Sequence, residues 1–218
     1  MSTITRNYLT HGTVQMLFLA LAAGLYGCVS LQLTNIGPWI LLVIATAPFY
    51  EWVTHKFMLH RPLTEKAGRW QEMQIKLHHG HHYAPENVSL QFAPAWAVVA
   101  NFLQLYVFYV LVCLLIGLPT LDALVPLTAS IAYYLFYEWI HLAHHTIDYR
   151  PKTAWGRRVR QAHMYHHFHN ENENWGITNM FADRILGTLQ TPQTSPKSPT
   201  ARTICGYPGE NISEDLRE

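Results

Sequence analysis

The sequence has few charged residues and few cysteines. Charged residues make up 13% of its 218 positions, whereas soluble domains carry about 25%. The three cysteines form no C-x-x-C motif, so neither a disulfide framework nor a zinc ribbon is indicated. A formal net charge of +1 is too small for a field that would bind nucleic acid. Half of the residues are hydrophobic, which excludes a largely disordered chain.

Several catalytic motifs are also absent from the sequence. There is no H-E-x-x-H, so a zinc protease of that type is not supported. There is no G-x-G-x-x-G and no P-loop, so no nicotinamide, flavin or ATP site is indicated. Cysteine-based ligation of haem or an iron–sulfur cluster is not visible either. A reaction with dioxygen would therefore take its electrons from a separate protein.

Four long apolar runs predict membrane-spanning helices. They cover about residues 13–32, 37–54, 93–117 and 122–142. A helix of about 20 apolar residues crosses roughly 30 Å of hydrocarbon. Gly117-Leu118-Pro119 predicts a break between the last two runs. The alternative is a soluble protein with four buried core helices, which runs of this length and low charge disfavour.

The basic residues predict the topology. All 15 lysines and arginines lie at Arg6, within 56–76 or from Arg150 onward. None lies in the turn between the first and second spans or in the turn between the third and fourth. With four spans, both termini and the middle loop share one side, which the positive-inside rule makes cytoplasmic. We therefore expect an all-α integral membrane protein. Its single domain, residues 1–190, would have four spans capped by a cytoplasmic helical part formed by residues 55–92 and 141–190. Residues 191–218, rich in proline, serine and threonine, predict a flexible tail.

Most of the 14 histidines fall into four clusters. The clusters read HKFMLH from His55, HHGHH from His78, HLAHH from His141 and HMYHH from His163. Positions i, i+3 and i+4 of a helix share a face, so each H-x2-HH is expected to aim three imidazoles at one point. His55 and His60 do not share a face on a regular helix, and could converge only where the helix ends or bends. The isolated His11 is expected to be a surface residue.

The clusters predict a metal centre, because so many imidazoles crowded together without metal would leave ring nitrogens unsatisfied. Ten candidates suit two metals with about five protein ligands each, leaving positions open for exchangeable ligands. Imidazole binds iron, copper and zinc alike, and an open position with a redox task favours iron, although zinc can occupy a purified sample. The ten candidate ligands are His55, His60, His78, His81, His82, His141, His145, His163, His166 and His167.

Three carboxylates are candidates to support the histidines of these clusters. Glu51 comes one turn before His55, and Glu138 comes three residues before His141. A carboxylate within an apolar span needs a partner, and a metal-bound histidine usually donates its other N–H to a carboxylate or carbonyl. We therefore expect both glutamates to support ligands, and Asp183 to do the same. The alternatives are a glutamate reaching the membrane interface and a surface role for Asp183.

The order H-x4-H, H-x2-HH, H-x3-H, H-x2-HH, with spans between the motifs, resembles the membrane fatty acid hydroxylase / sterol desaturase superfamily. The stretches EWVTHKFMLHRPL, HHGHHYAP, YEWIHLAHHTIDYRP and HMYHHFHNENENWGITNMFADRILGT are most similar to its fatty acid 2-hydroxylase branch. The resemblance covers roughly residues 48–190, and the combined pattern is far more specific than any one motif.

This resemblance implies a membrane di-iron enzyme that activates O2 and oxidises an unactivated C–H bond of a lipid. It implies that the ten histidines are the ligands, and that His79, His144 and His169 support them or lie near the substrate mouth. No His-Pro-Gly-Gly of a cytochrome b5 domain is present, so we expect a separate electron donor of cytochrome b5 or ferredoxin type. The bacterial inner membrane and the endoplasmic reticulum both suit the sequence.

The lipid substrate is expected to enter from the bilayer between the spans. Phe57, Met58, Tyr133, Tyr134 and Phe136 could line its path, with ordinary helix packing as the alternative for each. Hydroxylation of an acyl chain is the first interpretation of the site. Desaturation, or hydroxylation of a sterol or carotenoid, by the same metals is the second. A membrane zinc-binding protein without catalysis is the third.

Overall fold

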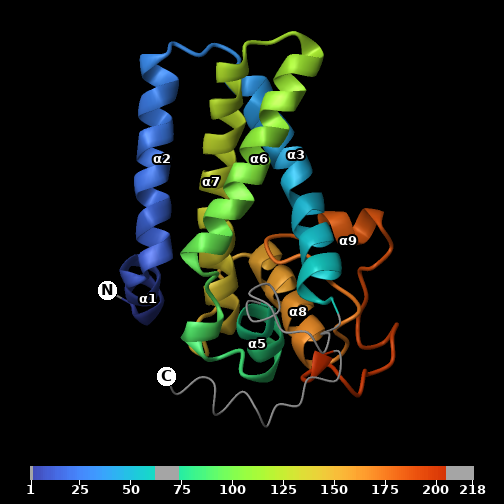
Figure 1. Ribbon diagram of the computed structural model, residues 1–218. Helices are drawn as coiled ribbons and strands as arrows, with labels where there is room; N and C mark the ends of the chain where they lie inside the picture. The colour runs from blue at the N-terminus through green and yellow to red at the C-terminus, as the bar shows by residue number, and fades with distance from the viewer. Residues whose placement is uncertain (1, 62–73, 205–218) are drawn as a thin grey trace. The chain divides into compact units, whose positions relative to one another are not determined.

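The computed structural model describes residues 2–61 and 74–204, and each regular element in these ranges is a helix (Figure 1). This agrees with the predicted all-α class. The chain divides into two compact units, the first formed by Met1–Ala47 and Ala93–Trp139 and the second by Pro48–Phe92 and Ile140–Glu218. The division falls within helices α3 (Ile36–Val53) and α7 (Leu124–His145).

The first unit is a helical bundle. Besides the beginning of α3 and most of α7, it contains α1 (Thr3–Thr10), α2 (Gly12–Ser30), α6 (Ala95–Ile116) and the short η4 (Thr120–Ala123). One apolar cluster joins α2, α3, α6, η4 and α7, and it is formed by Cys28, Trp39, Val43, Tyr109, Cys113, Ala123 and Val125. Within it the rings of Trp39 and Tyr109 meet edge to face at 6.3 Å, and the Tyr109 hydroxyl lies 2.8 Å from that of Ser130.

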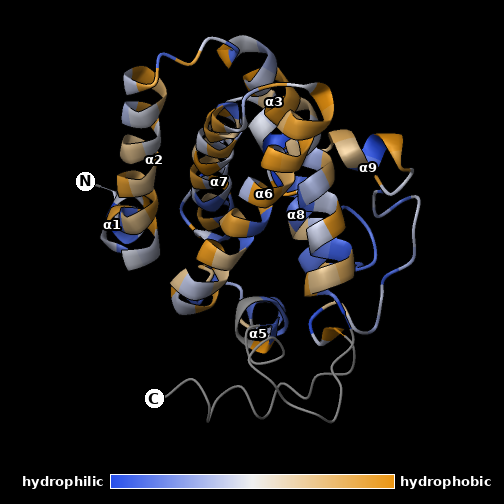
Figure 2. Cartoon of the chain, turned by 45° about the horizontal axis from the view of Figure 1, so that its top comes forward, coloured by the Kyte–Doolittle hydropathy of each residue, from blue (hydrophilic) through white to orange (hydrophobic). Residues whose placement is uncertain are grey.

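Among the described residues, three helical stretches are long and apolar enough to cross a membrane. They are Gly12–Ser30, Ile36–Leu59 and Val88–Ile116, and they match the first three predicted spans. Hydrophobic residues dominate α6 in Figure 2. The fourth predicted span, 122–142, is also helical, as α7, but it does not reach the same apolar content. The second half of α7, which ends at His145, carries Glu138 and three histidines.

The predicted break after the third span is a glycine-capped turn. Helix α6 ends at Ile116, and Gly117 takes the left-handed backbone conformation with φ 73°. That conformation suits glycine, which has no Cβ to clash. The next amide, of Leu118, donates to the carbonyl of Cys113 at 2.9 Å, so an orphaned helix-end carbonyl is satisfied. The chain can then reverse into η4 and α7.

The second unit holds the histidine clusters. Its elements are the end of α3, η1 (Thr54–Leu59), η2 (Ile75–His79), α5 (Gly80–Tyr83), η3 (Val88–Leu90), the end of α7, α8 (Ala154–Phe168) and α9 (Phe181–Ile185). Both η1 and η2 are π-helical turns. Helix α8 begins where the Thr153 hydroxyl accepts the amide of Gly156 at 3.0 Å, an ordinary N-cap.

The predicted flexible tail is partly within the described residues. Residues 191–204 belong to the second unit, where Ala201 and Ile204 are buried. The amide of Ser198 donates to the carbonyl of His169 at 2.7 Å. The remainder of the predicted tail, 205–218, lies outside the described residues.

Candidate metal centre

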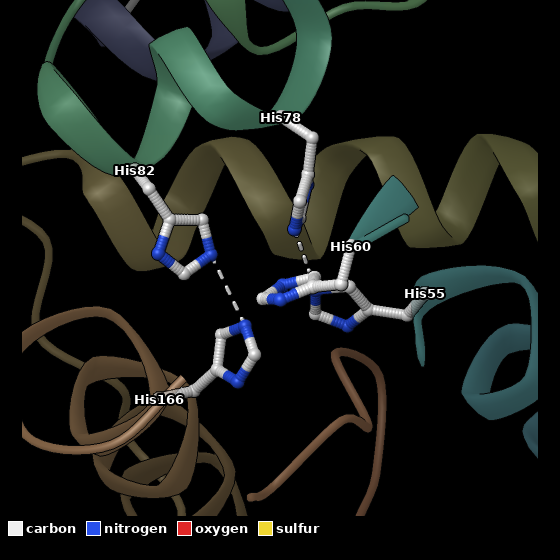
Figure 3. A group of neighbouring side chains, drawn as sticks. All are labelled: His55, His60, His78, His82 and His166. Atoms are coloured by element: carbon white, nitrogen blue, oxygen red, sulfur yellow. Dashed lines mark hydrogen bonds between the residues drawn. The ribbon is translucent and has the colours of Figure 1, made fainter. Parts of the chain in front are cut away.

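The structure gathers the ten candidate histidines into two groups of five. Within each group one nitrogen of every ring lies within 4.8 Å of the others. Group 1 consists of His55, His60, His78, His82 and His166 (Figure 3). Group 2 consists of His81, His141, His145, His163 and His167. Either group could hold a metal ion.

Neighbouring histidines serve different groups. His82 belongs to group 1 and His81 to group 2, and His166 and His167 divide in the same way. The expectation that each H-x2-HH aims all three imidazoles at one point was therefore wrong. Consecutive side chains on a helix diverge by about 100°, so positions i+3 and i+4 can face two sites while i and i+4 stay together. The pairing of i with i+4 brings His78 to His82.

A π-helical turn brings His55 and His60 together. The amide of His60 donates to the carbonyl of His55 at 3.1 Å, an i to i+5 bond. The wider turn places residues five apart near one face, and such turns occur often at functional sites. The two ring centroids are 5.1 Å apart. The helix therefore changes its pitch at the point where a regular α-helix would separate the rings.

A second π-helical turn, η2, positions His78. The amide of Gly80 donates to the carbonyl of Ile75. A Cβ added to Gly80 would stand 2.8 Å from that carbonyl oxygen, closer than real side chains approach. The glycine in HHGHH is therefore required by the close approach of the backbone.

The ring orientations in group 1 leave lone pairs facing one another. The Nδ1 atoms of His82 and His166 lie 2.9 and 2.7 Å from the carbonyl oxygens of Ala201 and Glu173, so these nitrogens carry the hydrogen. Their Nε2 atoms are then acceptors, yet they lie 3.1 Å apart (Figure 3). A hydrogen bond between them would need one ring to be protonated twice. A cation bound by both nitrogens satisfies the pair without that charge.

His55 and His78 repeat this geometry. The Nδ1 atom of His55 lies 2.5 Å from the carbonyl oxygen of Trp175, and its Nε2 lies 3.0 Å from the Nε2 of His78. The backbone therefore fixes the tautomer of three rings in group 1, and each directs its Nε2 into the group. Fixed ring orientation is what a bound metal requires of its histidines.

Group 2 is equally crowded. The Nε2 atom of His145 lies 3.1 Å from that of His81 and 2.8 Å from that of His163, and one N–H cannot serve both neighbours. Within the described part of the chain, neither ring nitrogen of the fully buried His167 has a hydrogen-bond partner. Buried polar atoms are rarely left unpaired, so this donor set also fits a metal.

Burial keeps the histidines outside the spans neutral. Loss of solvent lowers the pKa of His82 to about 3. Burial, and then the neighbouring His82, lower the pKa of His166 and of His167 well below the usual range. Neutral imidazole is the form that binds metal. At neutral pH these rings therefore offer lone pairs without first losing a proton.

One loop, residues 173–178, orients the rings of several elements. Its carbonyl oxygens at Glu173 and Trp175 face His166 and His55, and that of Ile177 lies 3.0 Å from the Nε2 of His144. The loop lies between α8 and α9 in the chain. Its backbone carbonyls accept the hydrogen bonds for which we expected carboxylates beside the ligands.

The predicted carboxylates Glu51 and Asp183 hold this loop. The Glu51 carboxylate accepts the amides of Ile177 and of Thr178, the latter at 2.8 Å, and the Thr178 hydroxyl at 2.8 Å. The Asp183 carboxylate accepts the amides of Trp175 and Gly176 at 2.8 and 2.7 Å. Both carboxylates are buried. They reach the histidines through the backbone of the loop.

The remaining predicted residues lie outside both groups. Glu138 belongs to the first unit, where its carboxyl bonds Tyr134 and the backbone of Ala93. His79 and His144 are buried next to ligand candidates, and the Nε2 of His169 lies 3.0 Å from the carbonyl of Ser195. His11 is half-buried at the start of α2.

The aromatic residues considered for a lipid path all pack within their own units. Phe57 is largely exposed, and its ring meets that of Trp52 at 5.7 Å in the second unit. In the first unit, Tyr134 stacks on Tyr137 at 5.4 Å and Tyr133 meets Phe136 at 6.4 Å. These contacts fit ordinary packing as well as a path.

Sequence reasoning missed the backbone acceptors. The carbonyls of Glu173, Trp175 and Ala201 carry no signal in residue type. Glu51 and Asp183 were the available signal in the sequence. A buried carboxylate needs hydrogen-bond donors, and the backbone amides of the N-W-G-I-T loop are suitable donors.

Comparison with known proteins agrees with this geometry. The sequence model described as fatty acid hydroxylase matches residues 40–188, more than half of the chain. Over 174 residues the chain is 28% identical to the dihydroceramide fatty acyl 2-hydroxylase FAH1 of Arabidopsis thaliana, covering 78% of this chain and 67% of that protein. Over 175 residues it is 25% identical to the ceramide very long chain fatty acid hydroxylase scs7 of Schizosaccharomyces pombe, covering 75% and 46%.

A solved structure shares the fold. The structure of full-length scs7p, in which only the hydroxylase domain is visible, matches with a TM-score of 0.63 at 21% identity. The match covers 85% of this chain and 66% of that chain. The chain spans less than half of the length of the fission-yeast relative. The match to the family over residues 40–188 confirms the resemblance seen in the histidine motifs: this chain belongs to the fatty acid hydroxylase family.

Proposed function

We propose that the protein is a membrane di-iron oxygenase that hydroxylates the acyl chain of a fatty acid or complex lipid, using O2 and external electrons. The observation that carries this proposal is the pair of five-histidine groups with converging lone pairs. The family and the two named relatives, which are fatty acyl hydroxylases of ceramide lipids, support the same reaction type.

Each group would hold one metal ion. Group 1 would bind the first ion and group 2 the second, each with five imidazole nitrogens. Five protein ligands would leave room for an exchangeable ligand on each ion. All ten donors are nitrogens, which suit iron, and zinc would compete for the sites in a purified sample. When bound, the iron pair supplies the activation of O2 that attack on an unactivated C–H bond requires.

The residues of the chain would orient the ligands and keep water out. The carbonyl oxygens of Trp175, Glu173 and Ala201 hold three rings of group 1 with Nε2 pointing inward. The indole of Trp175 lies 4.6 Å from the ring of His60, and both are buried. A dry and fixed site of this kind favours controlled oxidation over side reactions with solvent.

The membrane arrangement is part of the proposal. Three apolar helices and the predicted fourth span, 122–142, would place both termini and the metal centre on the cytoplasmic side. The substrate chain would enter from the bilayer between the spans. Electrons would come from a separate cytochrome b5 or ferredoxin-type protein, in either a bacterial inner membrane or an endoplasmic reticulum.

Lipid mass spectrometry tests this function. The wild type and a His81→Ala variant would be expressed in cells that make ceramides and contain a cytochrome b5-type donor. We expect an acyl-containing lipid class with one extra oxygen in the wild-type cells alone, because His81 belongs to group 2. Lipids lighter by two hydrogens would instead indicate a desaturase. Identical lipids in both cultures would contradict the proposal.

A further inference from the structure

A segment beyond the family match packs against the metal centre. Residues 195–204, here called the C-terminal strap, follow the last matched residue, 188. The Thr200 hydroxyl donates to Glu171 at 2.5 Å, and the Ser195 hydroxyl donates to Glu173 at 2.7 Å. With the bond from the Ser198 amide to the carbonyl of His169, these contacts fasten the strap to the segment that follows α8.

The strap contacts a candidate ligand directly. The carbonyl oxygen of Ala201 accepts the Nδ1 hydrogen of His82 at 2.9 Å, and both residues are buried. This bond leaves the Nε2 atom of His82 as the acceptor that faces His166 in group 1. Among the candidate ligands, the hydrogen bonds described for the strap reach His82 alone.

Arg202 contacts both α5 and the end of α8, which together carry five of the ten candidate ligands. Its Nε donates to the carbonyl of His82 at 3.1 Å, and its Nη2 donates to the carbonyl of Tyr83. These carbonyls lie in the last turn of α5, where helix carbonyls lack intrahelical partners and arginine is a suitable donor. The guanidinium also lies 5.2 Å from the ring of Phe168, at the end of α8.

We propose that the C-terminal strap is a structural part of the metal centre, and that Arg202 is a positioning residue that holds His82 in line with group 1. This inference rests on the proposed binding of metal by the two groups. Arg202 fixes the α5 backbone at His82, and Ala201 fixes the ring of the same residue. Groups that orient a metal-bound histidine typically change metal affinity about 10- to 100-fold when they are removed.

The test is metal binding by the full chain in detergent. Wild type, Arg202→Ala, Arg202→Lys and Lys197→Ala would be depleted of metal and equilibrated with a series of free zinc concentrations. Bound metal per chain is then measured by mass spectrometry of the elements, and size-exclusion chromatography reports folding. Lys197 is an exposed cation of the same strap, so its variant is the matched control.

We expect two ions in the wild type and in Lys197→Ala. Arg202→Ala should bind one ion with unchanged affinity and the other about tenfold more weakly. Arg202→Lys should fall between them, because a single ammonium cannot reproduce the two-pronged guanidinium contact. Wild-type affinity for both ions in Arg202→Ala would overturn the inference, as would loss of both ions from a monodisperse variant.

If Arg202→Ala aggregates, Arg202→Lys decides the question. Weaker binding of one ion by the lysine variant supports the inference, and unchanged binding of both overturns it. A wild type that binds no metal would contradict the proposed function itself, and the strap would then lose its role as well. If the wild type binds two ions and both Arg202 variants bind them with wild-type affinity, only the proposed role of the strap is contradicted.

Discussion

The Nδ1 atom of His55 lies 2.5 Å from the backbone carbonyl oxygen of Trp175, 120 residues further along the chain. The partner of this metal-ligand candidate is thus a peptide group, and the N–H of the same peptide group, that of Gly176, donates to the Asp183 carboxylate at 2.7 Å. A ligand-bearing helix and a distant loop are coupled through backbone atoms. Substitutions in the loop should therefore alter metal binding even though they replace no histidine.

Glu51→Gln should destabilise the protein. The carboxylate accepts the amides of Ile177 and Thr178 and the Thr178 hydroxyl in a buried position, and the glutamine amide would turn an N–H toward donors. Loss of hydrogen bonds to a buried charge costs about 1.5–3 kcal/mol. Thermal unfolding in detergent should show a lowered midpoint, with the exposed Asp148→Asn as control. An equal midpoint in both variants would show that Glu51 does not hold the loop.

His81→Ala and His82→Ala should each remove one metal ion, from different groups. The two residues are adjacent, but His81 belongs to group 2 and His82 to group 1. Each variant is therefore the matched control of the other, and the double variant should bind neither ion. The measurement is metal content per chain at a zinc concentration that saturates the wild type. Equal loss of both ions in each single variant would mean that the groups are not separate sites.

Gly80→Ala should disturb η2 and lower stability. The added methyl would meet the Ile75 carbonyl oxygen at 2.8 Å, and overpacking of this kind costs about 1–3 kcal/mol. Gly37→Ala is the control, because nothing lies within 4 Å of a Cβ there. We expect a lower unfolding midpoint and weaker metal binding for Gly80→Ala alone. If both alanines behave alike, the close approach in η2 is not important.

The metal-free protein should lose stability in acid. Burial lowers the pKa of His82 to about 3 and that of His166 well below the usual range, whereas unfolded histidines titrate near about 6.5. Below about pH 6.5 the unfolded chain therefore binds more protons, and stability falls until the folded pKa is reached. The thermal unfolding midpoint, measured in the presence of a chelator, should be lower at about pH 5 than at about pH 7.5.

A variant with fewer buried histidines controls the acid experiment. His82→Asn combined with His166→Asn removes two groups whose folded pKa is lowered. The double variant should show a shallower dependence on pH than the wild type. A wild-type midpoint that stays constant over the same range would contradict the neutral, buried state of these rings.

The helical class and the residues of the two groups could be predicted because each has a local signal. Three apolar runs became helices of span length, and the histidine spacing selected the ten residues that now lie in two groups. The bend required for His55 and His60 followed from helix geometry alone, and the π-helical turn supplies it.

The division of the histidines between the groups could not be predicted from spacing. It depends on how α5 and α8 face each other, which separates His81 from His82 and His166 from His167. The carbonyl acceptors were also invisible, because every residue has one. The contacts of residues 195–204 were missed because their proline- and serine-rich composition indicates weak burial, whereas Ala201 and Ile204 are buried.

Oxygen-isotope labelling during turnover tests the hydroxylase most directly. Membranes that contain the wild-type chain and an electron-donor protein would be supplied with ceramide and 18O2 in ordinary water. The proposed reaction predicts one heavy oxygen atom in the acyl chain of the product, and none with the His81→Ala variant. A product whose new oxygen comes from water, or one that has lost two hydrogens without gaining oxygen, would contradict it.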